Sequence, residues 1–160
     1  MARTQAPVRV RSKQPTNRLL RRLVAAGVVH VVPAGRMLFR QGEMPVAVFG
    51  ILSGRVTLSL DCCGDSVLSF TAGPGDLLGL CANISGKPYE VTAETASQAR
   101  IFYIRRPAFI QYLDRHPELC IEISQLLSKH LDALYGQIVR SRCTPRRARL
   151  ATIALDTVER

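Results

Sequence analysis

The chain has 160 residues, of which 47% are hydrophobic and 21% charged, and its formal net charge is +10 at pH 7. This composition excludes a largely disordered polypeptide, and the length suffices for one domain with its own core plus one or two further helices. The positive charge is concentrated at the two ends, because no acidic residue precedes Glu43 and a cluster of arginines lies between Arg140 and Arg149. Basic ends favour a polyanion such as nucleic acid, although a solubilising tail and a charged helix end explain them equally well.

Residues 1–16 lack hydrophobic periodicity, which predicts a flexible basic arm. Asn17 is a suitable cap for a short helix that ends near Gly27. Short aliphatic segments separated by glycine-containing turns follow, at 28–32, 37–39, 46–52, 56–60, 67–70 and 92–104, the last holding a strand pair or one long strand. Strands of this length and spacing predict a barrel or roll, so we expect a mainly β fold with flanking helices.

The period of the pattern changes after this β segment. Pro107 and Pro117 each suit the start of a helix, and the second helix is predicted to run to about Val139. Its apolar residues fall on two faces, and one helix leaning on a roll needs only one. The second face is a near-heptad seam that predicts pairing with a second copy of the chain, unless both faces are buried within one chain. The seam residues are Cys120, Leu127, Leu131, Leu134 and Ile138.

The cysteines give little support to a metal or disulfide site. They form no CxxC pair and no ligand-like spacing with the three histidines, and their odd number favours a reducing, cytoplasmic location. Arg21 and Arg22 before the apolar run 23–32 resemble the start of a signal peptide. That run contains Gly27 and His30, has no clear cleavage site and is shorter than the roughly 20 residues of a membrane span, so no membrane partner is expected.

A family resemblance rests on several motifs taken in order. These are the segment from Pro33 to Glu43, the segment from Phe49 to Leu58, Pro74-Gly75-Asp76 with Gly79, the Tyr89-x-x-Thr92-Ala93 segment, Ile101, Ile104, Phe109 and Pro117. In this order and spacing the chain resembles the cyclic-nucleotide-binding, Crp/Fnr-like regulators over roughly residues 28–155. The resemblance implies a double-stranded β-roll of the jelly-roll type, followed by a long dimerisation helix. It further implies a sensor domain at 17–113, a dimerisation helix at 114–143 and, at 144–160, the start of a helix-turn-helix domain.

In that family a phosphate-binding cassette follows the equivalent of Gly79. A Glu after the glycine binds the ribose, and an Arg followed by Ser or Thr binds the cyclic phosphate. Here Leu80 stands at the Glu position, Tyr89 at the Arg position and Glu90 at the Ser/Thr position. Because the cation is missing and Lys87 lacks the bidentate fork of arginine, we expect neither cyclic AMP nor cyclic GMP to bind. The pocket that the resemblance implies for another small effector consists of Leu78, Gly79, Leu80, Tyr89, Glu90, Val91 and Thr92.

The Tyr89-to-Ala93 segment resembles the Fnr-like branch, whose members sense gases or metabolites. The iron–sulfur version of that branch needs an N-terminal cysteine cluster, and no cysteine precedes Cys62, so no iron–sulfur cluster is expected. Haem stays a weaker alternative, because its axial ligands are available here only by residue type (His30, His116, His130 and Cys81). Cys62 and Cys63 are a second weaker alternative as redox sensors, and no metal site is predicted.

Regulators of this family continue into a winged helix-turn-helix, and only its first helix has a counterpart here. We therefore expect no base-specific DNA reading by this chain, whether it is a natural short form or a fragment. Weak, salt-sensitive phosphate contacts are expected at Arg140, Arg142, Arg146, Arg147 and Arg149. No catalytic constellation is visible, so the prediction is a homodimeric signal-sensing module without enzymatic activity, the alternative being a ligand-free protein-interaction module.

Overall fold

The structure is a computed structural model that describes residues 17–62 and 66–142. The predicted basic arm, Cys63 and the predicted last helix lie outside these residues. The chain divides into two compact units, Met1–Ile123 and Ser124–Arg160. The elements in chain order are α1 (Asn17–Ala26), β1 (Val28–Val32), β2 (Met37–Phe39), β3 (Ala47–Ser53), β4 (Val56–Cys62), β5 (Ser66–Ala72), β6 (Leu77–Leu78), α2 (Leu80–Ser85), β7 (Thr92–Thr95), β8 (Ala99–Arg105), α3 (Arg106–Arg115) and α4 (Pro117–Arg142).

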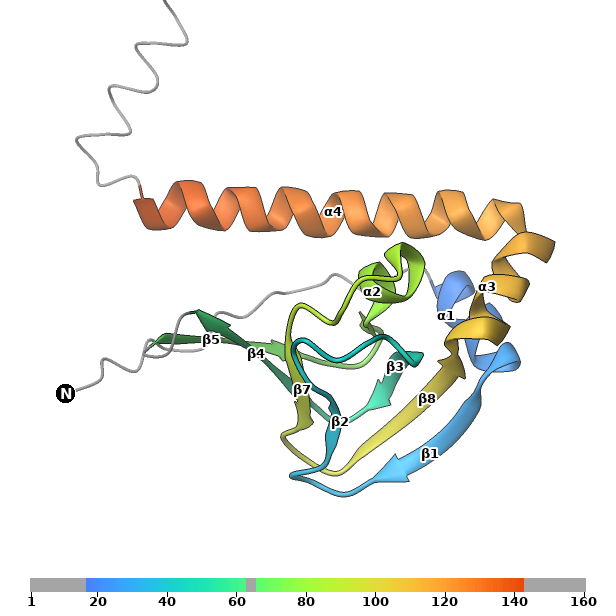
Figure 1. The fold of residues 1–160 in the computed structure, drawn as a ribbon, viewed down its shortest axis with the longest axis horizontal. Helices are drawn as coiled ribbons and strands as arrows, with labels where there is room; N and C mark the ends of the chain where they lie inside the picture. Colours follow the sequence, from blue (N-terminus) through green and yellow to red (C-terminus); the bar gives the residue numbers. More distant parts are fainter. Residues whose placement is uncertain (1–16, 63–65, 143–160) are drawn as a thin grey trace, which may run out of the picture. The chain divides into compact units, whose positions relative to one another are not determined.

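Two four-stranded antiparallel sheets form the β-roll (Figure 1). The strand order is β1-β8-β3-β6 in one sheet and β2-β7-β4-β5 in the other. Among the described strands, only β4 and β5 are consecutive in the chain and paired, whereas β1 pairs with β8 from Val28 opposite Tyr103 to Val32 opposite Ala99. The chain therefore passes repeatedly between the sheets, which confirms the predicted jelly-roll type of fold.

Part of the core lies between the inner faces of the sheets and includes Ile51 and Ile101, whereas Val48 and Phe102, which alternate with them along β3 and β8, are buried on the other face. β3 shows why these residues form a strand: Ala47, Val48 and Ile51 are buried, and Gly50 leaves space for a ring of the neighbouring strand. A Cβ atom on Gly50 would lie 2.1 Å from Cε1 of Phe102, which is fully buried. The core is thus close-packed, and a methyl group is enough to disturb it.

Glycine turns set the spacing of the strands, as predicted. Gly54 between β3 and β4 has φ +88°, and a Cβ atom there would lie 2.4 Å from the carbonyl oxygen of Gln98. A side chain would therefore be opposed both by the backbone angle and by the neighbouring loop. The predicted segment 92–104 contains two separate strands, β7 and β8, instead of one long strand.

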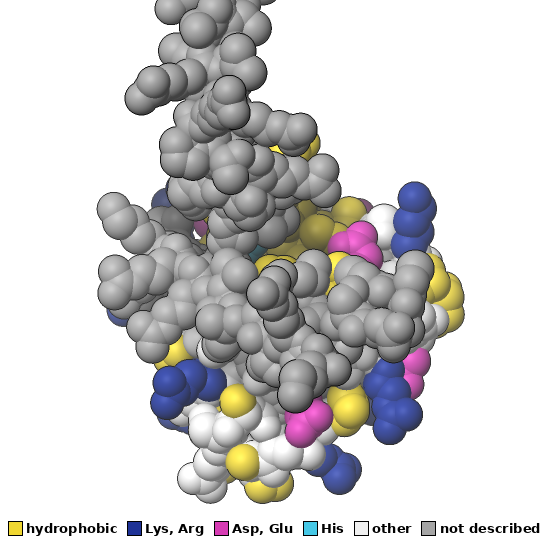
Figure 2. Space-filling model, turned by 90° about the vertical axis from the view of Figure 1, so that its left-hand side faces the viewer, with side chains coloured by type: hydrophobic (Ala, Val, Ile, Leu, Met, Phe, Trp, Pro, Cys, Tyr) yellow, Lys and Arg dark blue, Asp and Glu magenta, His cyan; other side chains and the backbone are white. Residues whose placement is uncertain are grey.

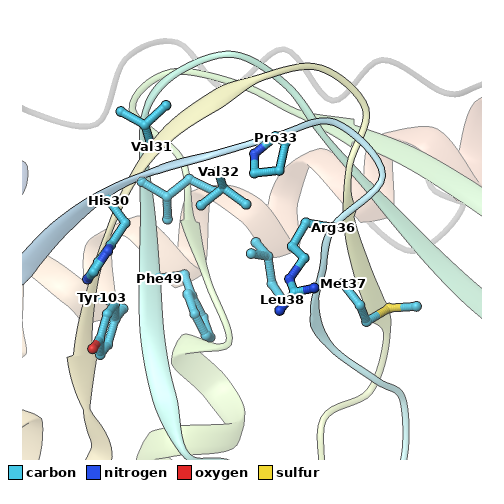
Figure 3. A pocket seen from close by; sticks show the side chains of 10 residues that line it. His30, Val31, Val32, Pro33, Arg36, Met37, Leu38, Phe49 and Tyr103 are labelled. Carbon is cyan, nitrogen blue, oxygen red and sulfur yellow. The ribbon is translucent and has the colours of Figure 1, made fainter.

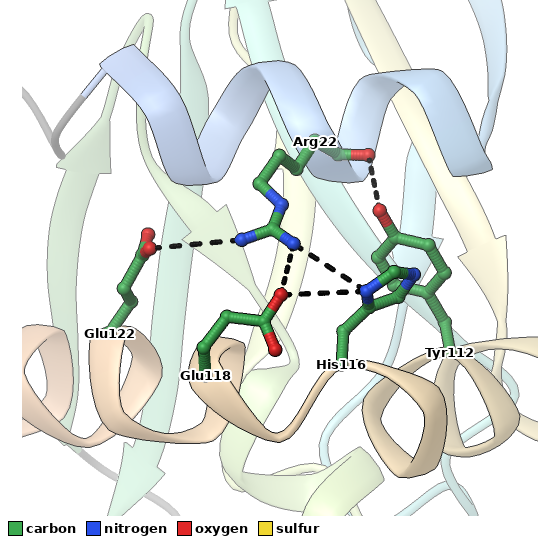
Figure 4. Close-up of polar contacts among 5 residues, drawn as sticks. All are labelled: Arg22, Tyr112, His116, Glu118 and Glu122. Atoms are coloured by element: carbon green, nitrogen blue, oxygen red, sulfur yellow. Dashed lines mark hydrogen bonds and ion pairs between the residues drawn. The ribbon is translucent and has the colours of Figure 1, made fainter.

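Polar contacts join α1 to the junction between α3 and α4 (Figure 4). The Arg22 guanidinium of α1 forms an ion pair and hydrogen bond with Glu118 and lies 4.0 Å from a carboxylate oxygen of Glu122. The hydroxyl of Tyr112 donates to the Arg22 carbonyl oxygen at 3.3 Å, and its ring lies against that of His116. The hydrogen bond from Arg22 lowers the pKa of the Glu118 carboxyl. This cluster fixes the first turn of α4 to the start of the domain.

Candidate ligand-binding sites

The cassette region begins where β6 turns into the short helix α2. Gly79 has φ +73°, and a Cβ atom at this position would lie 2.8 Å from Cε1 of Tyr89. The glycine is therefore needed both for its backbone angle and for the approach of the tyrosine ring. The six-residue helix α2 was not predicted from the sequence, where two flanking glycines suggest a turn.

Tyr89 fills the interior below α2. Its side chain is 2% exposed, and its ring stacks on Phe39 with centroids 4.0 Å apart. The hydroxyl donates to the Ala47 carbonyl oxygen at 2.8 Å and accepts from the backbone N–H groups of Val46 and Ala47 at 3.1 and 3.2 Å. At the position implied for the phosphate-binding arginine, this protein therefore has a buried ring fixed to the β3 backbone.

Asn83 of α2 supports the same arrangement and was missed by the sequence analysis. It is fully buried, and its side-chain amide donates to the carbonyl oxygens of Ala47 at 2.7 Å and Gly79 at 2.8 Å. The Arg106 guanidinium donates to the Asn83 carbonyl oxygen at 3.0 Å. Asn83 thus joins α2 to β3 through its buried side chain and to the start of α3 through its backbone carbonyl. The sequence signal that marks it is an amide side chain between the apolar residues Ala82 and Ile84.

The charges near the cassette do not face its interior. Glu90 and Lys87 are exposed, while Leu80, at the position implied for a ribose-binding glutamate, is 4% exposed and packed inside. Burial, with a smaller contribution from Glu90, raises the pKa of the Cys81 thiol. This shift disfavours the thiolate, which is the nucleophilic form of cysteine.

The structure brings the seven predicted pocket residues into one region but gives them different environments. Leu78, Leu80 and Tyr89 are buried, Glu90 is exposed, and the remaining members Gly79, Val91 and Thr92 are half-buried. Thr92 accepts a hydrogen bond from the Gln41 N–H at 3.0 Å. Their role in binding an effector stays a prediction.

A separate open cavity of about 580 Å³ lies between the edge strands β1 and β2 (Figure 3). None of the seven predicted pocket residues lines it. Its lining comes from β1, the turn after it, β2 and the facing parts of β3 and β8: His30, Val31, Val32, Pro33, Arg36, Met37, Leu38, Phe49, Ile101 and Tyr103. The sequence analysis missed this cavity, because it arises where two strands of different sheets diverge.

The predicted seam of α4 is only partly within the described side chains. Cys120 is exposed, Leu127 is half-buried and Leu131 is 48% exposed. Tyr135, one turn further on, is also exposed. Leu134 and Ile138 lie in the helix, but their side chains are outside the described ones. An apolar strip is therefore left open to solvent along the described part of α4 in a single chain.

The predicted phosphate contacts are not described at the side-chain level. Arg140 and Arg142 belong to α4, and Arg146, Arg147 and Arg149 lie outside the described residues. Figure 2 shows one face of the molecule, where Lys and Arg side chains occur at separate places with Asp and Glu side chains among them. Within residues 17–62 and 66–142, no group of three or more His, Cys, Asp or Glu side chains is arranged to hold a metal ion. No helix in the described part of the chain is long and apolar enough to cross a membrane.

Several solved structures share this fold. A cyclic nucleotide-binding domain from Methylobacillus flagellatus superposes with a TM-score of 0.69 at 22% identity, covering 81% of this chain and 75% of that one. The c-di-GMP responsive global regulator CLP of Xanthomonas campestris gives 0.65 at 20% identity, covering 85% and 70%. The catabolite activator protein of Thermus thermophilus gives 0.63 at 19% identity, and this chain spans 60% of its length.

Sequence comparisons identify the family of the domain. Among curated proteins, patatin-like phospholipase domain-containing protein 7 of Mus musculus is 24% identical over 110 residues, which are 67% of this chain and 8% of that protein. The family model described as "Cyclic nucleotide-binding domain" matches residues 29–116, more than half of the chain. The glycine turns, the two-sheet roll and the cassette helix α2 all fall within that match, and the chain therefore belongs to the cyclic nucleotide-binding domain family.

Proposed function

We propose that this chain is a Crp-like regulatory module, homodimeric through α4, that responds to a signal other than cyclic AMP or cyclic GMP. The observation that carries this proposal is the placement of Tyr89, buried and hydrogen-bonded to β3 at the position implied for the phosphate-binding arginine. A regulatory role also fits the family, whereas phospholipase chemistry belongs to a relative of which this chain matches only 8%.

The physical reason is the cost of burying an anion. A cyclic phosphate that enters a closed site needs a cation or several N–H donors, because an unpaired buried charge is strongly unfavourable. Here the interior position holds an uncharged ring, and the adjacent residue is the carboxylate of Glu90. A nucleotide would have to displace Tyr89 from Phe39 and Ala47 before it gained any compensating contact.

Isothermal titration calorimetry tests this part of the proposal. We expect no saturable heat with either cyclic AMP or cyclic GMP up to millimolar nucleotide. The variant Glu90→Gln, which removes the carboxylate and leaves Tyr89 in place, should also fail to bind. Micromolar affinity of the unmodified protein for either nucleotide would refute the proposal.

The proposed homodimer rests on the exposed apolar strip of α4, which includes Leu131 and Tyr135. Apolar residues at heptad spacing favour a helix pair, and a second copy is the simplest partner. We expect Leu131→Glu to shift the protein toward the monomer in sedimentation velocity, because a charge would enter the seam. Gln125→Glu adds the same charge at an exposed position away from the seam and should leave the dimer intact. Equal sedimentation of both variants and the parent would contradict this interface.

The second candidate function is a ligand-free interaction module. The close packing around Tyr89 favours this function over a haem sensor, because a haem under α2 would need space that the ring already fills. In that case α4 would bind a different protein of the same family instead of a second copy of this chain. A purified parent protein that is monomeric and unaffected by small molecules would move the assignment to this second function. Membership of the Fnr-like branch and weak phosphate binding by the arginines near the end of α4 stay predictions.

A further inference from the structure

We infer that the cavity between β1 and β2 binds a small carboxylic acid with an aromatic or otherwise apolar body. This site is distinct from the seven-residue pocket under α2 and does not depend on whether that pocket is used. Its walls come from one edge strand of each sheet, β1 and β2, which diverge at the turn from Pro33 to Arg36, and from the facing parts of β3 and β8 (Figure 3). A cavity of about 580 Å³ is within the usual range of about 300–1,000 Å³ for small-molecule sites.

The floor and inner walls of this cavity are apolar. Val32, Leu38 and Phe49 are partly buried side chains packed against the core, and Ile101 is 2% exposed. An apolar ligand body placed on Phe49 would cover these side chains and remove them from water. The preformed sheets hold this surface, so a ligand does not need to open the core.

One cation is available at this apolar surface. Arg36 belongs to the turn between β1 and β2, where its backbone N–H donates to Thr95 Oγ1 at 2.8 Å. Figure 3 shows its guanidinium pointing toward the cavity. Within the described residues the guanidinium forms no ion pair, although Glu94 is nearby at the Gly35 turn. An unpaired arginine beside an apolar floor favours a ligand with one carboxylate, which accepts two parallel N–H donors.

Aromatic rings on the side of the cavity opposite Arg36 favour a planar ligand body. The His30 ring stacks on Tyr103 with centroids 5.4 Å apart and an interplanar angle of 23°. Tyr103 in turn contacts Phe49 at 6.3 Å, and both line the cavity. Aromatic side chains bind flat rings by stacked or edge-to-face contacts. The cavity thus combines a ring-binding floor with a single anion-binding group.

The same rings connect the cavity to the cassette. Phe49 lies 5.6 Å from Phe39, and Phe39 stacks on Tyr89 at 4.0 Å between ring centroids. A continuous series of packed rings therefore runs from the cavity to the residue that closes the interior below α2. A ligand that shifts Phe49 changes the packing of Tyr89 through one intervening ring, which gives this site a physical route to α2.

Titration of 1-naphthylacetate, followed by calorimetry and by the methyl resonances of Val32 and Leu38 in NMR spectra, tests this inference. The neutral 1-naphthylacetamide is the matched ligand with the same ring and no charge. We expect the acid to bind with saturation and about tenfold more tightly than the amide, and both ligands to shift the same methyl resonances. Arg36→Gln should remove that preference, so that the two ligands bind equally. Arg40→Gln, an exposed arginine outside the cavity, should keep it.

Three results would overturn the inference: no saturable binding of either ligand, an unchanged preference for the acid in Arg36→Gln, or shifts confined to residues around α2. Cyclic nucleotide titration and sedimentation of the same samples report separately on the proposed function. Failure of the cavity proposal is therefore distinguishable from failure of the Crp-like assignment.

Discussion

Replacing Tyr89 with phenylalanine tests whether this residue is fixed in the interior. The substitution keeps the ring against Phe39 and removes only the hydroxyl. The Ala47 carbonyl oxygen keeps its second donor, the Asn83 amide at 2.7 Å, so it remains bonded. The buried Ala47 N–H loses its acceptor, whereas Val46 is exposed and its N–H can bind water.

The expected loss in the free energy of unfolding follows from the one buried N–H group, that of Ala47, which loses its acceptor. Leaving a buried N–H without a partner costs about 1–3 kcal/mol, which for a domain of this size lowers the melting temperature by roughly 3–10 °C. Differential scanning calorimetry and urea unfolding measure both quantities. Tyr103→Phe keeps a half-buried ring, removes a hydroxyl outside the contacts of Tyr89 and should leave stability unchanged. If Tyr89→Phe were as stable as the parent, the hydroxyl would not hold the ring, and Tyr89 would not be a fixed obstacle to a cyclic nucleotide.

Three further changes have outcomes set by the structure. Gly50→Ala should destabilise by about 1–3 kcal/mol or more in urea unfolding, because its methyl group would overlap the buried Phe102 ring, whereas Gly73→Ala meets nothing within 4 Å and should be near neutral. Glu118→Gln should reduce stability at neutral pH, because Arg22 lowers the folded-state pKa of this carboxyl. The stabilisation by the ionised carboxylate is fully present above the unfolded-state pKa and is lost as the pH falls through the folded-state pKa. The stability difference between parent and variant should therefore shrink as the pH is lowered in unfolding experiments, and a gap that does not shrink would contradict the ion-pair explanation. Asn83→Ala should lower the melting temperature in the same calorimetric assay, since two carbonyl oxygens lose a donor, and an unchanged value would show that water replaces the amide.

The strands were predictable because their signals are local. Alternating aliphatic residues and glycines at turns can be recognised within a few consecutive residues of the sequence. The predicted strands at 28–32 and 37–39 accordingly match β1 and β2. The helix α2 was missed because six residues between two glycines carry too little periodicity to distinguish a helix from a turn. Helix signals become reliable only over several turns.

The sites were less predictable than the fold. Alignment of the motifs identified Tyr89 as a substitute for arginine, but not its bonds to Val46 and Ala47, which depend on how β3 and the 86–91 loop meet. The cavity near Arg36 was missed for a similar reason. Its lining residues are distant in the chain, and most of them look like ordinary strand residues until the register of β1 on β8 is known.

The pairing of β1 with β8 has a consequence for the synthesis of the protein. β1 is near the start of the described chain, but its only partner within the described residues is the last strand of the roll. During translation, at roughly 5–20 residues per second, the Val28–Val32 segment therefore waits several seconds without its partner. Such a β-branched segment, which contains no Asp, Glu, Lys or Arg, is prone to pair with other nascent chains. The yield of correctly folded protein should therefore depend on expression rate and on chaperone supply more than on final stability.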